Sequence, residues 1–135
     1  MKIQTYLTFD GTCKQAFEFY AKALGAKIEM MMTHGESPVA EQTPKEWRDK
    51  IMHASLTVGD QSLMGSDQPD SKEPIGGFSV SLSVEKPADA ERLFKALSQG
   101  GTVGMEMQET FWAQRFGMLT DRFGVPWMVN CERPR

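Results

Sequence analysis

The fold of this chain is decided by its closing stretch, Thr110-Phe-Trp-Ala-Gln-Arg-Phe-Gly-Met-Leu-Thr-Asp-Arg-Phe-Gly-Val-Pro-Trp-Met128. Two runs rich in apolar residues flank Asp121-Arg-Phe-Gly124 within it. Glycine at the end of such a turn supplies the positive φ that a tight reversal of the chain requires. The stretch therefore predicts a hairpin of two strands, which we place over residues 114–131.

Two helices are predicted from apolar residues that recur at helical spacing. The first covers residues 12–24, with its stripe at Ala16, Phe19, Tyr20, Ala23 and Leu24. The second covers residues 87–99, with its stripe at Ala90, Leu93, Phe94 and Leu97. Glycines follow both helices as stop signals, and Pro87 suits a first helical turn.

Each helix belongs to one of two similar halves of the chain. The first half adds strands over 3–9 and 27–33 and a hairpin over 51–66. The second half adds strands over 78–84 and 102–107 and the hairpin over 114–131. The predicted fold class is therefore α+β, a single domain of paired βαβββ modules over 1–66 and 78–135, joined by a linker over 67–77.

Local patterns add detail to these elements. Alternation over residues 78–84 predicts an apolar side, packed under the second helix, and a serine side, Ser79, Ser81 and Ser83. Gly59-Asp60 predicts a two-residue hairpin turn. A loop over 34–43 is expected to lead into a short helix, with Thr43 and Glu46 forming a capping box and Pro44 at its first position.

Composition excludes several classes of function. With 135 residues, 40% of them hydrophobic and 24% charged, the chain fits one globular domain. A net charge of −3 gives no basic face for nucleic acid. No apolar run reaches the ~18 residues of a membrane span and no signal peptide is apparent, so we expect a cytoplasmic protein without a membrane partner. Cys13 and Cys131 have no CxxC neighbour and are expected to be reduced structural thiols.

Three stretches together resemble a known superfamily. They are Tyr6-Leu-Thr-Phe-Asp-Gly11, Ile51-Met-His-Ala54 and the closing stretch quoted above. Over nearly its whole length the chain is similar to the vicinal oxygen chelate superfamily, which includes glyoxalase I, bleomycin-resistance proteins, fosfomycin-resistance enzymes and extradiol dioxygenases. Within that superfamily it most resembles the PhnB-like family, sometimes labelled 3-demethylubiquinone methyltransferase-like.

The resemblance implies eight strands in a mixed sheet curled around a cavity, the glyoxalase/bleomycin-resistance fold, and a homodimer. It does not carry a methyltransferase activity with it. A methyl-donor nucleotide would call for a glycine-rich turn between a strand and a helix, and the sequence has none. We therefore expect no nucleotide cofactor.

Metal-dependent members of the superfamily bind a divalent ion with His and Glu side chains on four strands. Matching by motif places these four positions on Thr5, Met64, Ser79 and Met128. Hydroxyls bind Zn²⁺, Ni²⁺, Mn²⁺ or Fe²⁺ weakly, and a thioether is too soft a donor for them. The resemblance and these substitutions together predict that no metal is bound.

Two functions from different classes remain. The first is a metal-free protein that binds an unknown small molecule, as bleomycin-resistance proteins do. Its expected pocket residues are Thr5, His53, Ser55, Met64, Ser79, Ser81, Trp112 and Met128, with Phe111 at the mouth. Trp112 and Trp127 are alternatively core or dimer-interface aromatics.

The second is an enzyme of the lyase, transferase or dioxygenase type, using acid–base chemistry or a weakly bound metal. His53 is its candidate base because an unperturbed imidazole titrates near neutrality. The sequence offers no visible carboxylate partner for it, and a histidine on a buried strand is also commonly a hydrogen-bonded structural residue. A purely structural module, with its cavity filled by side chains, is a third alternative.

Overall fold

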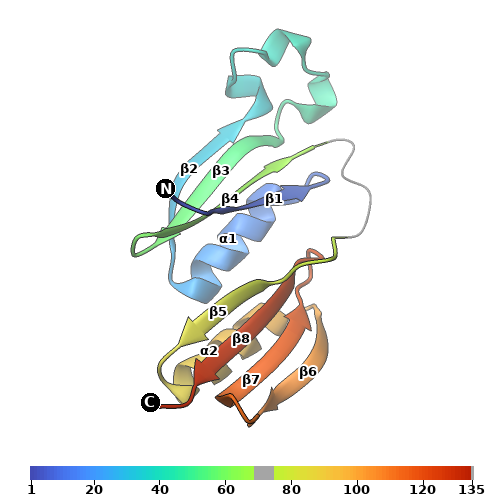
Figure 1. Cartoon of the computed structure of the whole chain (residues 1–135). Coiled ribbons are helices and arrows are strands. Elements are labelled where there is room, and N and C mark those ends of the chain that lie inside the picture. Colours follow the sequence, from blue (N-terminus) through green and yellow to red (C-terminus); the bar gives the residue numbers. More distant parts are fainter. Residues whose placement is uncertain (69–74, 135) are drawn as a thin grey trace. The chain divides into compact units, whose positions relative to one another are not determined.

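The chain forms two compact units in a computed structural model, which describes residues 1–68 and 75–134. The units run over Met1–Glu73 and Pro74–Arg135, and each is a βαβββ module with its own four-stranded mixed sheet (Figure 1). The α+β class and the paired modules are therefore confirmed. Of the predicted linker, residues 69–74 lie outside the described residues, and Asp67 is the last residue of a strand.

The first module contains β1 (Thr5–Phe9), α1 (Cys13–Leu24), β2 (Lys27–Thr33), β3 (Ile51–Val58) and β4 (Gln61–Asp67). Its strand order is β1-β4-β3-β2, with β1 parallel to β4 and the other pairs antiparallel. Three short 3-10 helices, His34–Glu36, Ala40–Gln42 and Lys45–Trp47, connect β2 to β3.

The second module contains β5 (Val80–Val84), α2 (Pro87–Ser98), β6 (Thr102–Gln108), β7 (Ala113–Thr120) and β8 (Pro126–Glu132). Its strand order is β5-β8-β7-β6, with β5 parallel to β8. The closing hairpin predicted from the sequence is β7 and β8, and Gly124 has the expected positive φ of 90°. The two sheets therefore share one topology.

Helix α1 packs on the first sheet through a stripe of buried side chains. These are Cys13, Ala16, Phe17, Tyr20 and Ala23. Phe19, which the spacing placed in the stripe, is only half-buried, whereas Phe17, which the prediction omitted, is fully buried. The helix is therefore rotated by part of a turn from the predicted orientation. Gly25 ends it in the left-handed conformation, as predicted.

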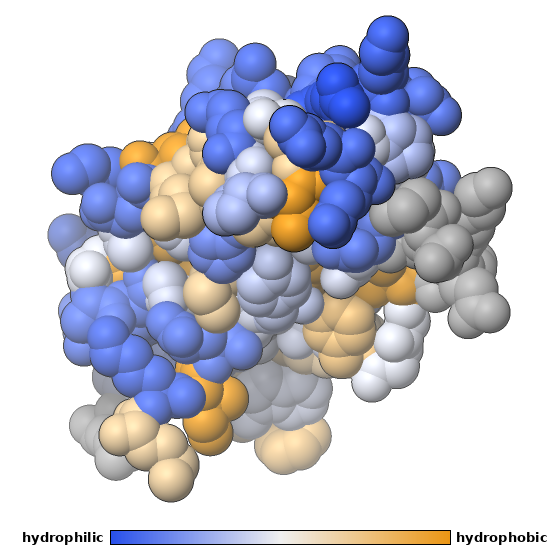
Figure 2. Space-filling model, turned by 90° about the horizontal axis from the view of Figure 1, so that it is seen from above, coloured by the Kyte–Doolittle hydropathy of each residue, from blue (hydrophilic) through white to orange (hydrophobic). Residues whose placement is uncertain are grey.

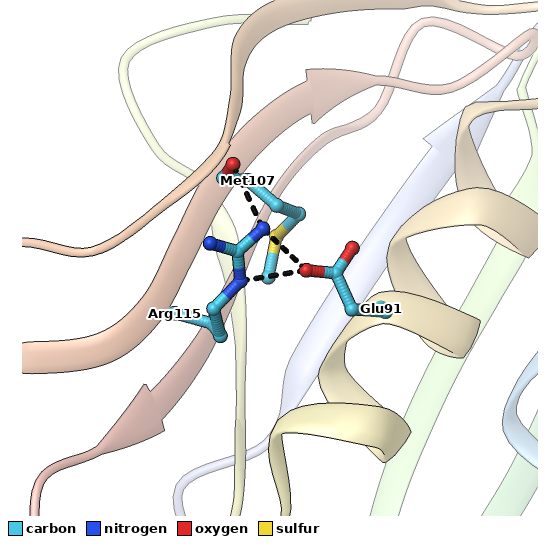
Figure 3. A network of polar contacts seen from close by, with 3 residues as sticks. All are labelled: Glu91, Met107 and Arg115. Atoms are coloured by element: carbon cyan, nitrogen blue, oxygen red, sulfur yellow. Dashed lines mark hydrogen bonds and ion pairs between the residues drawn. The ribbon is translucent and has the colours of Figure 1, made fainter.

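Helix α2 buries the four residues predicted for it, Ala90, Leu93, Phe94 and Leu97. It is also tied to β7 by a polar contact (Figure 3). The Arg115 guanidinium lies 2.5 Å from the Glu91 carboxylate and donates to the Met107 carbonyl oxygen at 3.0 Å.

No helix within the described parts of the chain is long and apolar enough to cross a bilayer.

A buried carboxylate holds the first module together at the end of β4. Asp67 is 1% exposed, and its oxygens accept hydrogen bonds from the backbone N–H groups of Gly11, Cys13 and Ile51 at 2.9–3.0 Å. These donors belong to the start of α1 and to β3, so one side chain fixes β4, α1 and β3 to each other. Charge-assisted bonds of this kind are the strong ones.

A second buried carboxylate occupies a different place in the second module. Asp121 is 3% exposed and accepts from the backbone N–H groups of Phe123 and Val125 and from Nε1 of Trp127. All three donors lie within six residues of it. Asp121 therefore fixes the turn between β7 and β8 and positions the buried indole behind that turn.

Two local predictions are wrong. No capping box forms at Thr43, because its hydroxyl donates to the Val39 carbonyl oxygen and Pro44 caps the following turn without a side-chain bond. A capping box forms instead at Thr33, before the first 3-10 helix. Phe78 does not pack under α2: it precedes β5, whose pairing begins at Val80, and it is 44% exposed.

The surface mixes polar and apolar residues. On the face drawn in Figure 2, hydrophobic residues emerge as separate small groups between hydrophilic ones. Single exposed apolar residues are normal for a folded protein. In this molecule an exposed apolar side chain therefore indicates a binding site only where other apolar side chains share its face and surround a polar group.

Candidate functional site

Each sheet has one face covered by its helix and one face turned away from it, which we call the distal face. In the first sheet, a Cβ atom on Gly65 would lie 2.8 Å from Phe17 Cε1, so the Gly65 position faces α1. Leu7 pairs with Gly65 and lies on the same side. Because strand residues alternate, Tyr6 and Met64 lie on the distal face.

Hydroxyl and thioether groups cross the distal face of the first sheet. One row over the four strands consists of Tyr6, Met64, Ser55 and Met30. His53 lies two residues before Ser55 on β3 and therefore on the same face. Tyr6 is 46% exposed and His53 is half-buried, so the ring edges are accessible to a ligand.

Tyr6 and His53 form a hydrogen-bonded pair over this row. The Tyr6 hydroxyl lies 3.2 Å from Nδ1 of His53, and the ring centroids are 5.7 Å apart. The two residues come from β1 and β3, which are separated by β4. Both long side chains therefore lean across β4 to meet, and either Nδ1 or the hydroxyl is the donor in this bond, according to the tautomer of His53.

The distal face of the second sheet is more apolar. A Cβ atom on Gly117 would lie 2.7 Å from Phe94 Cε2, so the Gly117 position faces α2 and the next residue, Met118, faces away. The corresponding row consists of Ser81, Met128, Met118 and Met105. Three adjacent thioethers make a polarisable surface that adapts to the shape of a ligand.

Aromatic rings continue this second face. Phe116 lies on it two residues before Met118, and the Trp112 ring meets Phe116 edge to face at 5.3 Å. Phe111 meets Trp112 edge to face, with ring centroids 4.8 Å apart, and is 89% exposed. Thr110 anchors the loop that carries both rings, since its hydroxyl accepts from the Ala113 N–H group. The rings are therefore held at the edge of the face.

One buried polar atom on the second face lacks a partner. Oδ1 of Asn130 on β8 is buried and has no hydrogen-bond partner among the residues described. Asn130 pairs with Ser83 and Phe116, two residues beyond Met128 on the same face. An unsatisfied buried acceptor costs about 1–3 kcal/mol, so this oxygen is a candidate contact for a donor on a ligand.

The structure brings most of the predicted pocket residues onto the two distal faces. His53, Ser55 and Met64 share the first face, Ser81 and Met128 share the second, and Trp112 stands beside it. Two residues fall elsewhere. Thr5 pairs with Leu63 on the side that faces α1, and Ser79 precedes β5, half-buried and outside the strand.

The match by motif gave Thr5, and a one-residue error in such a match moves a strand residue to the opposite face. The residue that pairs with Met64 is Tyr6, which the sequence analysis did not assign to the pocket. Its signal was present in the alternation of β1, where Leu7 and Phe9 are buried and Tyr6 is not. Asn130 and the buried Asp67 carried no such signal.

These side chains do not fit the divalent metal of the superfamily. Within the described residues, no three His, Cys, Asp or Glu side chains gather as a set of ligands. Two of the matched positions, Met64 and Met128, lie on the distal faces, and their neighbours in the rows are Tyr6, Ser55, Ser81 and Met118, so these rows supply hydroxyls and thioethers. Such donors suit neither Zn²⁺ nor the harder divalent ions.

Cysteine chemistry is also unfavourable. Burial, with a smaller contribution from the nearby Asp67 carboxylate, raises the pKa of the Cys13 thiol to about 12. The thiol therefore stays protonated at neutral pH, and a protonated thiol is a poor nucleophile. Cys131 is buried as well, and both cysteines are free.

The match to a family model covers residues 1–130, and that family is described as 3-demethylubiquinone-9 3-methyltransferase. The chain belongs to this family. The PhnB-like assignment made from the sequence motifs is thereby confirmed. Protein YjdN of Escherichia coli is 36% identical, over 98% of this chain and 97% of its own length.

Solved structures agree on the fold of the family. The crystal structure of PA1353 from Pseudomonas aeruginosa is 51% identical, covers 99% of both chains and has a TM-score of 0.91. A glyoxylase/bleomycin resistance protein/dioxygenase domain from Frankia is 15% identical, covers 98% of this chain and 92% of its own, and has a TM-score of 0.68. The chain therefore has the glyoxalase/bleomycin-resistance fold.

The methyl-donor nucleotide that the family's description implies does not fit the start of α1. A nucleotide-binding turn offers free backbone N–H groups at a helix N-terminus to the ligand. In this chain the N–H groups of Gly11 and Cys13 are already bound by Asp67. The sequence between β1 and α1 contains one glycine, so the backbone there has neither the donors nor the glycine-rich shape of such a site.

Proposed function

We propose that this protein binds a small molecule on its distal faces and does so without a metal ion. One observation carries the proposal: the rows through Met64 and Met128 consist of accessible hydroxyl and thioether side chains. Mostly apolar walls with a few well-placed polar groups are the usual composition of a small-molecule site. The fold shared with a glyoxylase/bleomycin resistance protein/dioxygenase domain supports a ligand-binding role.

A thermal-shift screen of small molecules in the presence of EDTA tests this proposal. A ligand that binds only the folded state stabilises it by roughly 2.7 kcal/mol at a hundredfold excess over its Kd. We expect such ligands to raise the Tm of the wild-type protein, and elemental analysis to find no stoichiometric Mn, Fe, Ni or Zn in protein purified without a histidine tag.

Matched substitutions locate the binding. Met128→Glu and Met64→Glu each place a carboxylate in one of the two rows, and at least one of them should abolish the shift because a desolvated charge opposes an apolar ligand. Val103→Glu is the control, since Val103 lies on β6, is 38% exposed and pairs with Leu119 on the opposite side. Binding that needs an added divalent ion, or that survives both methionine substitutions, would overturn the proposal.

An acid–base enzyme is the second candidate, and it is favoured by the 3.2 Å contact between Tyr6 and His53. The sequence showed no carboxylate partner for His53, whereas in the fold the phenol group of Tyr6 lies beside its ring. A binding protein needs no such pair of titratable groups on one face. The two candidates share a site and differ in whether a proton moves.

A further inference from the structure

We infer that Tyr6 and His53 form a proton-transfer pair that acts on an uncharged carbonyl compound with an acidic C–H bond beside the carbonyl group. The inference goes beyond ligand binding, but it rests on the proposed function because the substrate occupies the distal face of the first sheet. It assigns to Tyr6 a catalytic role that the sequence alone did not indicate.

The geometry gives the pair one donor and one acceptor that are both available. A neutral imidazole carries a proton on one nitrogen and a lone pair on the other. When Nδ1 of His53 donates to the phenol oxygen, the Tyr6 O–H group is free to donate to a ligand. Nε2 then keeps its lone pair, and within the described residues no polar partner occupies it.

This arrangement supports a balanced proton transfer. Nε2 of His53 takes the proton from the carbon beside the carbonyl, and the electron pair of the C–H bond becomes the C=C bond of the enol. The carbonyl oxygen receives the proton of the Tyr6 hydroxyl, and the phenol oxygen takes the proton of Nδ1. His53 ends as its other neutral tautomer, so the enol forms without net charge and without any oxidant, reductant or cofactor. Return of the proton to the same or a neighbouring carbon completes an exchange or an isomerisation.

The surroundings of the pair indicate that the substrate is uncharged. Its neighbours in the row are Met64 and Ser55, which offer no counter-charge to an anion or a cation. On the edge strand β2, Lys27 and Glu29 lie 3.8 Å apart and neutralise each other. A charged ligand placed over Met64 would lose its hydration without compensation, which is costly. A neutral ketone needs only the hydrogen bond from Tyr6.

Deuterium exchange into hydroxyacetone, followed by ¹H NMR in D₂O, tests the inference. We expect the wild-type protein to accelerate exchange over buffer by on the order of a hundredfold, the lower end of the usual range for general acid–base catalysis. Tyr6→Phe and His53→Gln should each remove most of that acceleration. The chain contains one other tyrosine and one other histidine, so Tyr20→Phe and His34→Gln are matched controls and should retain it.

A second measurement separates catalysis from mere structure. The ¹⁵N shifts of the His53 ring report its tautomer, and Tyr6→Phe should change the balance between Nδ1–H and Nε2–H while His34→Gln leaves it unchanged. Wild-type exchange equal to buffer, or Tyr6→Phe and His53→Gln proteins that are folded and as active as wild type, would overturn the inference. If compounds from the thermal-shift screen still bind while exchange is absent, the binding function stands and only the proton-transfer role fails.

Discussion

The two modules share one topology, yet they are stabilised differently and present different surfaces. Asp67 joins three segments of the first module, with donors 16 to 56 residues away in sequence, whereas Asp121 organises a turn whose donors lie two to six residues away. The first distal face carries the Tyr6–His53 pair, and the second carries methionines and aromatic rings. The shared topology therefore determines where the strands lie, but it does not determine which polar groups stabilise each module or which side chains its distal face presents.

The two modules should differ most in the stability that the fifth residue of each helix contributes. Phe17 in α1 is fully buried against the sheet, and Glu91 is its counterpart in α2. Phe17→Ala leaves a large cavity and should lower the free energy of unfolding by about 3–5 kcal/mol. Urea denaturation followed by circular dichroism measures it. A loss below about 1 kcal/mol would show that α1 does not depend on this contact.

Replacing the buried aspartate should cost more stability in the first module than in the second. Asp67→Asn replaces a carboxylate oxygen by an amide that faces an N–H donor, and it should cost about 2–3 kcal/mol because three distant segments lose their shared acceptor. Asp121→Asn should cost about 1–2 kcal/mol, since its local turn can rearrange toward water. Urea denaturation of both variants provides the comparison, and an equal loss in the two would contradict the long-range role of Asp67.

Alkaline pH should destabilise the first module through Cys13. The pKa of its thiol is about 12 in the folded state against 9.0 for a free thiol, so between these values the unfolded chain loses a proton that the folded chain keeps. Stability is therefore fully present below pH 9 and falls as the pH rises, by about 1.4 kcal/mol per pH unit at most.

The difference in unfolding free energy between pH 8 and pH 10 measures this effect. The difference should be smaller by about 1 kcal/mol in Cys13→Ala than in wild type, because the substitution removes the titrating group while leaving the lysines and tyrosines. An identical pH dependence in the two proteins would show that Cys13 is solvated more than its burial implies.

The smallest effect is expected from the ion pair in the second module. Arg115 and Glu91 are in close contact, but their side chains remain 33% and 48% exposed. Glu91→Ala should therefore cost about 0.5 kcal/mol, and added salt should reduce that cost further. A loss approaching that of Phe17→Ala, measured in the same urea titration, would mean that the ion pair stabilises the second module as much as Phe17 stabilises the first.

Much of the fold followed from sequence because its signals are local and periodic. The stripe of α2 and the hairpin around Gly124 were placed correctly, since each depends on spacing within a few residues. Across β1 the same reasoning failed for Thr5, because the length of the connection to α1 is not encoded in the strand pattern. One residue of error there exchanged the faces of Thr5 and Tyr6.

The candidate site was only partly predictable for a related reason. His53 stood out because an imidazole is the usual acid–base group near neutral pH, but its phenol partner comes from β1, 47 residues earlier. Only the pairing of β1 and β3 with β4 between them brings the two side chains together. Asn130 and Asp67 were missed because burial, and not residue type, gives them their importance.

Methionine-methyl NMR tests the central claim most directly. The chain has ten methionines, of which Met64 and Met128 lie on the distal faces, whereas the sulfur of Met107 lies 2.6 Å from a Cβ placed on Gly117, on the side that faces α2. With the methyl groups labelled and a thermal-shift ligand added in EDTA, we predict that the Met64 or Met128 signals move and the Met107 signal stays. Movement of Met107 alone, or shifts that appear only after a divalent metal is added, would contradict metal-free binding at the distal faces.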